Sequence, residues 1–419
     1  MGGFYRREAD NPDNRFESLS LEWEEGAERP QEMRVYRETA KSILSTNDSP
    51  DIPFRFSVNP YRGCAHACAY CYARTYHEYL GWGAGTDFDT RIVAKVNAPE
   101  LLEKELSKPS WKGDSIVFSG VTDCYQPAER ALGLTRGCLE ACLRHQTPVG
   151  LITKSALVLR DLEVLRALAE GPGASVVLSI PFLDAEEARK IEPFAASPDA
   201  RFLALEKLSA AGIRTGISIS PVIPGWNDSD IPKLLKRAAQ CGASFAFYTL
   251  LRLPGAVEEV FMSRLRASFP ERAGKVEHHQ RQVRGGTLNQ TEFGKRFEGQ
   301  GKMADVIEDL FQIHVRKKGL NRPEGRGRKY RMELTPPQAP LSPLLKPKKK
   351  RGRQICAEAK PTAKRASKPA SRPVRLNRPG RLNNSAHALA ERFGLRQQAQ
   401  DEHVFVEVKE ITGMGQHAL

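Results

Sequence analysis

Three cysteines occupy one short stretch of the chain and have the spacing of metal ligands. Cys64, Cys68 and Cys71 lie within eight residues, with three residues between the first two and two between the last two. Thiolates are soft ligands that favour iron–sulfur clusters, zinc or Cu(I). Three thiols on one loop suit a cubane cluster that leaves one iron open to a small molecule. A structural zinc site needs a fourth ligand at matching spacing, and His66 is the only other soft ligand in the loop.

The sequence around this loop predicts alternating strands and helices. Runs rich in β-branched residues predict strands at 54–58, 115–119, 149–153, 175–180, 214–219 and 245–251. Amphipathic runs predict helices such as 128–144, 157–169, 201–211 and 231–240, and Gly212 and Gly242 follow the last two as expected cap residues. Such alternation is typical of an α/β fold with a parallel sheet. Six units are too few for a closed eight-stranded barrel, so an open partial (β/α)6 barrel fits.

Polar side chains follow the predicted strands. In a parallel barrel the chemistry lies at the carboxyl ends of the strands. Polar candidates there are Thr122 and Asp123 after the second strand, Lys154 after the third, and Ser179 at the end of the fourth. Each of them alone fits a helix cap or a solvated loop residue. Their convergence on the rim that carries the cysteine loop predicts a functional site.

The positive charge of the chain is concentrated near its carboxyl end. Residues 316–381 contain 22 Lys and Arg against 3 Asp and Glu, a net charge of +19, which leaves −5 for the rest of a chain whose total is +14. This proline-rich segment is too polar to fold alone. It fits either a solvated tail or an electrostatic tether for RNA or DNA. We expect an N-terminal extension (1–49), a core (50–320), a disordered basic linker (321–385) and a short helix and strand (386–419).

Composition also bears on the cellular compartment. The eight cysteines show no secretory disulfide spacing, and the first residues contain no apolar signal core. No apolar run approaches the length of a membrane span. We therefore expect a cytoplasmic protein without a membrane partner, and a monomer.

Several short phrases resemble a known enzyme group. The cysteine spacing, with Tyr70 just before the third cysteine, resembles the cluster loop of the radical S-adenosylmethionine (SAM) enzymes. The chain is similar to the branch that contains spore photoproduct lyase and is often labelled "DNA repair photolyase", and to a less characterised bacterial subgroup within it. The phrases are SVNPYRGC (57–64), GVTD (120–123), YQP (125–127), ITK (152–154), PVIPG (221–225), LLRLP (250–254) and RGG (284–286).

The resemblance implies cofactors and their ligands. Cys64, Cys68 and Cys71 would bind a [4Fe–4S] cluster, and SAM would bind its open iron and be cleaved reductively to a 5′-deoxyadenosyl radical. An electron donor such as flavodoxin or ferredoxin is implied as a partner. The SAM-binding residues implied are Thr122 and Asp123 for the amine, Lys154 for the carboxylate, Ser179 for the ribose or carboxylate, and Tyr70, Val222 and Ile223 for the adenine.

One position departs from the lyase pattern. Gly120 occupies the place of the cysteine that donates hydrogen in spore photoproduct lyase, while Cys124 lies four residues later. Repair of the spore thymine lesion is therefore doubtful. Cys124 is either an ordinary small residue or a redox or hydrogen-donor residue.

Aromatic residues and arginines surround the expected mouth of the barrel and could stack bases and hold phosphates. They are Tyr61, Arg62, Tyr72, Arg74, Tyr76, Tyr79, Trp82, Tyr125, Arg252, Arg284 and Arg296. A nucleic acid is therefore one substrate class, beside peptides and small metabolites. The alternative to an enzyme is a nucleic-acid-binding protein with a structural iron–sulfur or zinc site. Such a protein would have no use for Thr122, Lys154 and Ser179.

Overall fold

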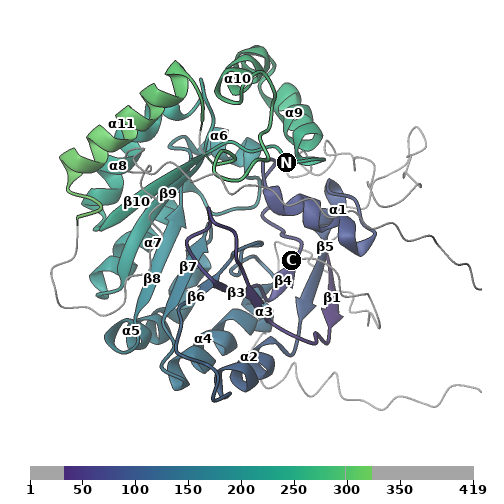
Figure 1. Cartoon of the computed structure of the whole chain (residues 1–419), viewed down its shortest axis with the longest axis vertical. Coiled ribbons are helices and arrows are strands. Elements are labelled where there is room, and N and C mark those ends of the chain that lie inside the picture. Colours follow the sequence, from purple (N-terminus) through teal and green to yellow (C-terminus); the bar gives the residue numbers. More distant parts are fainter. Residues whose placement is uncertain (1–32, 298, 323–419) are drawn as a thin grey trace, which may run out of the picture. The chain divides into compact units, whose positions relative to one another are not determined.

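One open seven-stranded sheet organises the chain (Figure 1). The computed structural model describes residues 33–297 and 299–322. In these residues six strands run parallel and follow one another across the sheet in chain order, while β2 pairs antiparallel with β3 at one edge. From edge to edge the strands are β10 (Phe245–Leu250), β9 (Arg214–Val222), β8 (Ala174–Ser179), β7 (Val149–Thr153), β6 (Ile116–Phe118), β3 (Phe56–Val58) and β2 (Leu44–Thr46). The predicted α/β fold with six parallel strands is confirmed.

The central strands have the composition of strands covered on both faces. In β8 every residue after the first is buried, and in β7 all but Ile152 are buried. Parallel strands covered by helices read as nearly continuous apolar runs, which explains why the sequence predicted them well. Their carboxyl ends meet at one edge of the sheet, so residues that follow the strands are brought together.

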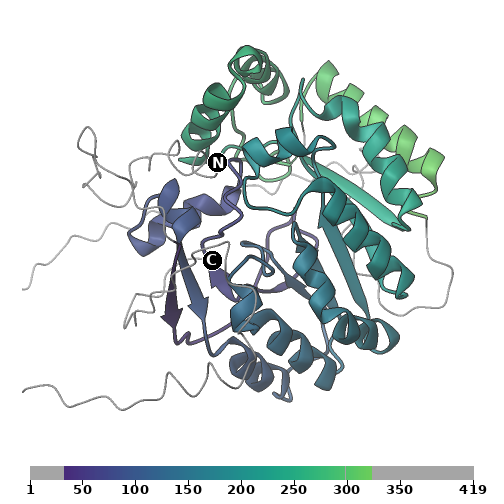
Figure 2. The same ribbon diagram turned by 180° about the vertical axis from the view of Figure 1, so that it is seen from behind.

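Helices that connect the strands pack on one face of the sheet (Figures 1 and 2). They are α4 (Leu134–Arg144), α5 (Leu162–Glu170), α7 (Pro198–Ala210) and α8 (Ile231–Gln240), and α11 (Lys302–Lys318) packs beside α8. In α8 the buried residues recur with helical spacing, as in Ile231, Leu234, Leu235 and Ala238. The remaining helices are α1 (Thr86–Thr90), α2 (Ala98–Leu106), α3 (Glu129–Leu132), α6 (Ala185–Ile191), α9 (Val257–Ser268) and α10 (Pro270–Val283).

Two predicted helices differ from the observed ones. The helix expected at 128–144 is interrupted at Gly133, whose φ of 63° is left-handed, and so forms α3 and α4. The helix expected at 157–169 begins as the 3-10 segment Ala156–Asp161 before α5. Gly212 and Gly242 have φ of +78° and +88°, which confirms them as left-handed residues after α7 and α8.

A second, three-stranded sheet contains β1 (Arg34–Glu38), β5 (Arg91–Lys95) and β4 (Tyr61–Arg62). β1 pairs parallel with β5, and β4 pairs antiparallel with it. Two strands from the expected N-terminal extension, β1 and β2, therefore pair with strands of the core. The expected linker (321–385), apart from Asn321 and Arg322, and the expected helix and strand (386–419) lie outside the described residues. No described helix has the length and hydropathy of a membrane-spanning segment.

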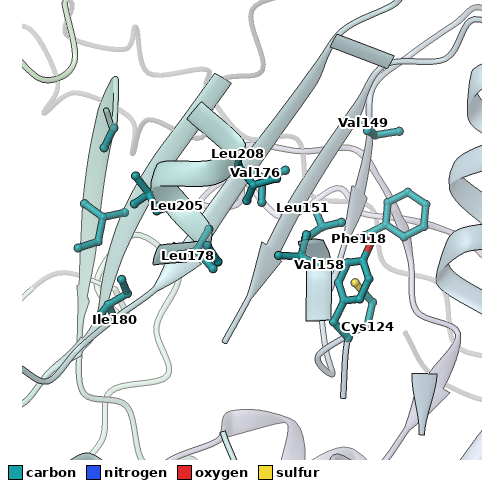
Figure 3. Close-up of a cluster of buried hydrophobic side chains, with 14 of the residues drawn as sticks. Phe118, Cys124, Val149, Leu151, Val158, Val176, Leu178, Ile180, Leu205 and Leu208 are labelled. Carbon is teal, nitrogen blue, oxygen red and sulfur yellow. The ribbon is translucent and has the colours of Figure 1, made fainter. Parts of the chain in front are cut away.

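The main apolar core lies between the parallel sheet and its helices. It contains side chains of β6, β7 and β8 together with those of α4, α5 and α7. Figure 3 shows Cys124 in this core, among Phe118, Leu151 and Val158. Cys68 and Tyr70 belong to a separate apolar cluster. Part of the cysteine loop therefore lies in a different apolar environment from that of Cys124.

Candidate active site

The cysteine loop follows β4 and carries three thiols that form no disulfide. Cys64 and Cys68 are buried, and Cys71 is half-buried. Burial raises the pKa of all three thiols. The charges of Asp123, Cys71 and Cys68 raise the pKa of Cys64 further, so the thiols lie close enough to oppose one another's ionisation.

The chemistry of this donor set fits a group with several metal atoms. In residues 33–297 and 299–322 no three His, Cys, Asp or Glu side chains are placed to hold a single metal ion. A cubane cluster presents a different iron to each thiolate, so its ligands need not converge on one point. Three neighbouring thiolates would repel one another, and bound metal offsets that repulsion because it neutralises their charge. The loop thus has the ligands for a cluster without the convergence of a single-ion site.

Gln126 fixes the start of the loop. This side chain is fully buried, accepts a hydrogen bond from the Ala65 N–H at 3.0 Å, and donates one to the Gly63 carbonyl at 3.1 Å. Gly63 has φ of +72°, and a Cβ there would lie 2.8 Å from the Arg91 carbonyl oxygen. Gln126, the middle residue of YQP, therefore fixes the loop backbone, because its side-chain amide bonds backbone groups of both Gly63 and Ala65.

Arg74 fixes the end of the loop. Its guanidinium is fully buried and donates to the Cys68 carbonyl at 3.0 Å and to the Ala84 and Gly85 carbonyls at 2.9 Å each. It also forms an ion pair with Asp89 at 2.8 Å. Arg74 is one of the arginines that the sequence predicts as substrate ligands, but its donors are occupied by the protein itself.

Asp123 joins the ends of two neighbouring strands. Its carboxylate accepts hydrogen bonds from the Tyr125 N–H at 2.9 Å, the Thr153 hydroxyl at 2.7 Å and the Lys154 N–H at 2.7 Å. The His66 ring lies 3.4 Å away. Burial alone would raise the pKa of Asp123, but His66 and these hydrogen bonds outweigh burial and lower the pKa to about 2. Asp123 is thus a fixed anion between the cysteine loop and β7.

Lys154 directs its ammonium group toward residues of the next strand ends. Its Nζ donates to the Ser179 hydroxyl at 2.5 Å and lies 3.4 Å from the Ser220 carbonyl oxygen. The same nitrogen lies 3.6 Å from Glu192 Oε1 and 5.5 Å from the centroid of the Tyr70 ring. Burial lowers the pKa of Lys154 to about 8. The structure therefore brings together the predicted residues Lys154, Ser179 and Tyr70.

Sequence reasoning missed Glu192 and Arg201, which connect these residues. Glu192 is buried and accepts hydrogen bonds from the Tyr70 hydroxyl and from the Arg201 guanidinium. Arg201 is also buried and donates to the Ser179 carbonyl at 2.9 Å. Glu192 follows α6, where no spacing or motif distinguishes it from an exposed loop carboxylate, so only the tertiary structure reveals its role.

The residues expected to cover an adenine lie in two apolar clusters. Tyr70 and Ile223 belong to the cluster that contains Cys68, whereas Val222 belongs to the main core. Ile223 is fully buried, and its N–H donates to the Asn227 side chain at 2.6 Å. Tyr70 and Ile223 therefore form an apolar surface beside the loop, whereas Val222, the residue before Ile223, packs in the main core.

Thr122, Cys124 and Gly120, near the end of the second predicted strand, are each packed against other parts of the protein. The Thr122 hydroxyl donates to the Tyr61 carbonyl at 2.8 Å. Cys124 is fully buried in the main core, and burial raises the pKa of its thiol. These surroundings disfavour a role for Cys124 as hydrogen donor. A Cβ at Gly120 would lie 3.2 Å from the Ser57 Cβ, so a cysteine at that position would be crowded.

The aromatic residues of the rim divide into buried and exposed groups. Tyr61 and Tyr125 are buried, and their hydroxyls donate to the acidic residues Glu129 and Asp161. The exposed aromatics are Tyr72, Tyr76 and Tyr79, with exposed fractions of 41%, 41% and 43%. The second group offers ring surface to another molecule, whereas Trp82 is half-buried and its ring packs beside those of Tyr36 and His77.

Comparisons with known proteins agree on the class. The pattern of the radical SAM superfamily matches residues 58–238. An uncharacterized protein of Mycobacterium tuberculosis is 38% identical over 222 residues, which cover 52% of this chain and 65% of the relative. An uncharacterized protein of Methanocaldococcus jannaschii is 30% identical over 220 residues, which cover 52% and 77%. A protein of Pseudomonas phage M6 named radical SAM Nalpha-GlyT isomerase is 26% identical over 219 residues, which cover 51% and 43%.

The fold is similar to that of solved structures of spore photoproduct lyase. The complex with a dinucleoside spore photoproduct has a TM-score of 0.51 and 17% identity, and the likeness covers 68% of this chain and 80% of the lyase chain. At this identity the likeness shows the fold. The chain belongs to the radical SAM superfamily, a superfamily of enzymes. Within that superfamily, the fold of the chain is similar to that of spore photoproduct lyase, and its relatives by sequence include uncharacterized proteins.

Proposed function

We propose that the chain is a radical SAM enzyme whose Cys64, Cys68 and Cys71 bind a [4Fe–4S] cluster. Membership of the superfamily supports the class of chemistry. The observation that carries the proposal is three free thiols beside Lys154 and Asp123, at the carboxyl ends of parallel strands. When bound, the cluster supplies one electron to SAM, which yields methionine and a 5′-deoxyadenosyl radical that abstracts hydrogen from the substrate.

The residues around the loop have the charges that SAM requires. Lys154 would bind the SAM carboxylate, since its ammonium group is already oriented by Ser179 and is close to one carboxylate, Glu192. Thr122 and Asp123 would receive the amine, and Ser179 would contact the ribose or the carboxylate. Glu192 would hold the side chains of Tyr70 and Lys154 in position relative to each other, because it contacts both of them.

The apolar residues would bind the other end of SAM. Tyr70 and Ile223 share one apolar cluster with Cys68, and such a surface suits the adenine ring. Val222 would support Ile223 from the main core. Burial of these groups and of Cys64 and Cys68 would limit access of water to the site, which would protect radical intermediates from side reactions.

We propose a nucleic acid or nucleotide as substrate class. The exposed rings of Tyr72, Tyr76 and Tyr79 support base stacking. Spore photoproduct lyase has been solved with a dinucleoside spore photoproduct, which is consistent with this class. Gly120 stands where the resemblance places the lyase's hydrogen-donor cysteine, so we propose a reaction other than repair of that lesion.

The partners follow from this chemistry. Reduction of the cluster needs an electron donor such as flavodoxin or ferredoxin. The free state of Cys64 and of six other cysteines in the described residues suits a reducing compartment, and we propose the cytoplasm. We propose a monomer that acts without a membrane.

Anaerobic reconstitution with iron and sulfide tests the proposal. The wild-type protein should gain about four irons per chain, with the brown colour of a [4Fe–4S] cluster, and dithionite should then drive formation of 5′-deoxyadenosine from SAM. Replacement of Cys64, Cys68 or Cys71 by Ala should abolish both. Cys241→Ala is the matched control, because this half-buried thiol follows α8 and forms no disulfide.

Two results would contradict the proposal. Stoichiometric zinc in the purified protein without uptake of iron would favour a structural metal site in a nucleic-acid-binding protein. If the protein binds the cluster but forms no 5′-deoxyadenosine, the cluster does not cleave SAM and the proposed enzyme activity is wrong.

A further inference from the structure

Arg252, Arg284 and Arg296 lie near one another, and they differ in the number of acceptors that the protein offers them. Arg252 follows β10, Arg284 follows α10, and Arg296 lies in the segment before α11. Arg252 and Arg296 both stack on Phe297, with their guanidinium carbons 4.7 Å and 5.0 Å from the ring centroid. Two of the three cations therefore share one aromatic ring.

Arg296 and Arg284 have acceptors within the protein. Arg296 forms a two-pronged ion pair with Asp51, with nitrogen–oxygen distances of 2.7 Å and 2.5 Å. Arg284 donates to the Leu251 carbonyl at 2.8 Å and to the Leu250 carbonyl at 3.2 Å. The donors of these two arginines thus hold the rim together.

Arg252 differs from both. Among residues 33–297 and 299–322 none of its nitrogens forms a hydrogen bond or an ion pair, whereas Arg284 donates to backbone carbonyls and Arg296 pairs with Asp51. Burial and the positive charge of Arg296 lower its pKa by more than the charges of Tyr72, Asp51 and Tyr76 raise it, which indicates a cation that is only partly compensated. With one face on Phe297, the edge of the guanidinium is left to bind an anion through two parallel hydrogen bonds.

The position of Arg252 connects it with the candidate active site. Its charge acts on Tyr72, and the charge of Cys71 acts on the same tyrosine. The Tyr72 hydroxyl donates to the Gly120 carbonyl, which fixes the ring while 41% of the residue stays exposed. An anion on Arg252 would therefore lie next to a fixed aromatic surface and near the cysteine loop.

We propose that Arg252 binds a phosphate group of the substrate, with the attached base stacked on Tyr72. This inference rests on the proposed function, because it orients the substrate toward the radical chemistry at the cysteine loop. A guanidinium matches the tetrahedral oxygens of phosphate in a bidentate manner, and a tyrosine ring accepts any base. The substrate is then a nucleotide, either free or within a strand.

Binding of cytidine 5′-monophosphate to the reconstituted full-length protein tests the inference. A pyrimidine is chosen so that it does not compete for an adenine site. Wild type should bind cytidine 5′-monophosphate at least tenfold more tightly than cytidine, and Arg252→Gln should lose that difference. Arg166→Gln is the control, since it removes one exposed positive charge from α5. A single-stranded deoxycytidine decamer as competitor distinguishes a strand from a free nucleotide.

The outcomes separate this inference from the proposed function. Equal binding by wild type and Arg252→Gln, or no binding by wild type, would overturn the phosphate site even where 5′-deoxyadenosine forms normally. Succinate that competes as well as the nucleotide would overturn phosphate in favour of a carboxylate. If Arg252→Gln does not fold, Arg252→Lys serves, because it keeps the charge but loses the planar fork and should still lose tenfold. Failure of wild type to cleave SAM concerns the proposed function alone.

Discussion

The glycine before the first cysteine should be needed for full cluster loading. Gly63 has φ of +72°, and a Cβ at this residue would lie 2.8 Å from the Arg91 carbonyl oxygen and 3.0 Å from the Phe88 carbonyl oxygen. The Phe88 carbonyl also accepts the hydrogen bond of the Cys64 N–H at 3.0 Å. Since both obstacles are backbone atoms, Gly63→Ala must displace the start of the loop.

The magnitude follows from two contributions. A side chain in the left-handed region costs about 1–2 kcal/mol. Loss of the Cys64 hydrogen bond adds about 1 kcal/mol, so Gly63→Ala should lower the free energy of unfolding by about 2–3 kcal/mol. Gly113 is the matched control, because its φ is +76° and a Cβ there would meet no atom within 4 Å. Gly113→Ala should lose only the first contribution, about 1–2 kcal/mol.

Urea unfolding of the metal-free proteins and iron content after reconstitution measure the two effects. A loss of 2–3 kcal/mol leaves a domain of ordinary stability folded, so Gly63→Ala should be soluble but poorly loaded. Gly113→Ala should load iron as wild type does. The reasoning fails if both variants lose the same stability and bind the same iron, because the close approach to Arg91 and Phe88 would then have no consequence.

Three other predictions concern different parts of the chain. Lys154→Ala should weaken SAM binding roughly 10- to 150-fold in equilibrium dialysis while iron content stays unchanged, and unchanged affinity would refute its assignment to the SAM carboxylate. Arg74→Met removes the guanidinium that pairs with the buried Asp89 carboxylate and should cost about 3–5 kcal/mol in urea unfolding; a loss like that of Arg166→Met would argue against a structural role for Arg74 in the loop. Truncation after Arg322 keeps Asn321, which bonds both backbone groups of Ala246, and should preserve cluster loading and SAM cleavage. It should remove most salt-dependent nucleic-acid affinity, and an unchanged salt slope would contradict the tether.

The sequence was most informative where local pattern and chain order decide the structure. The parallel strands are short apolar runs buried on both faces, so each could be found without knowledge of its neighbours. Their chain order is also their order in the sheet, which brings Asp123 and Lys154 together as predicted. The helix at 128–144 was predicted too long because one left-handed glycine, Gly133, interrupts an otherwise continuous pattern.

Residues whose roles depend on distant partners could not be assigned from sequence. Glu192 bonds to Tyr70, 122 residues earlier, and nothing near Glu192 in the sequence indicates this contact. Arg74 and Arg252 both read as rim arginines beside aromatic residues. The structure separates them, because Arg74 donates to carbonyls and pairs with Asp89, whereas Arg252 packs on the face of Phe297 and forms no hydrogen bond with the described residues.

The balance of charge in the site leads to a last prediction. Lys154 and Arg201 both contact one carboxylate, Glu192, and burial lowers the pKa of Lys154 to about 8. Arg252 pairs with no carboxylate in the described residues. SAM at Lys154 and a nucleotide at Arg252 would then each supply a missing negative charge. Each would stabilise the folded chain by mass action, by about 2.7 kcal/mol at a concentration one hundred times its dissociation constant.

Differential scanning calorimetry of the reconstituted protein tests this balance. SAM and cytidine 5′-monophosphate should each raise the Tm, and together their shifts should be nearly additive because they occupy separate sites. Lys154→Ala should reduce the shift caused by SAM and leave the shift caused by the nucleotide unchanged, whereas Arg252→Gln should do the reverse. A single variant that removes both shifts would mean that the two anions share one cation. The separation of the SAM site from the substrate site would then be wrong.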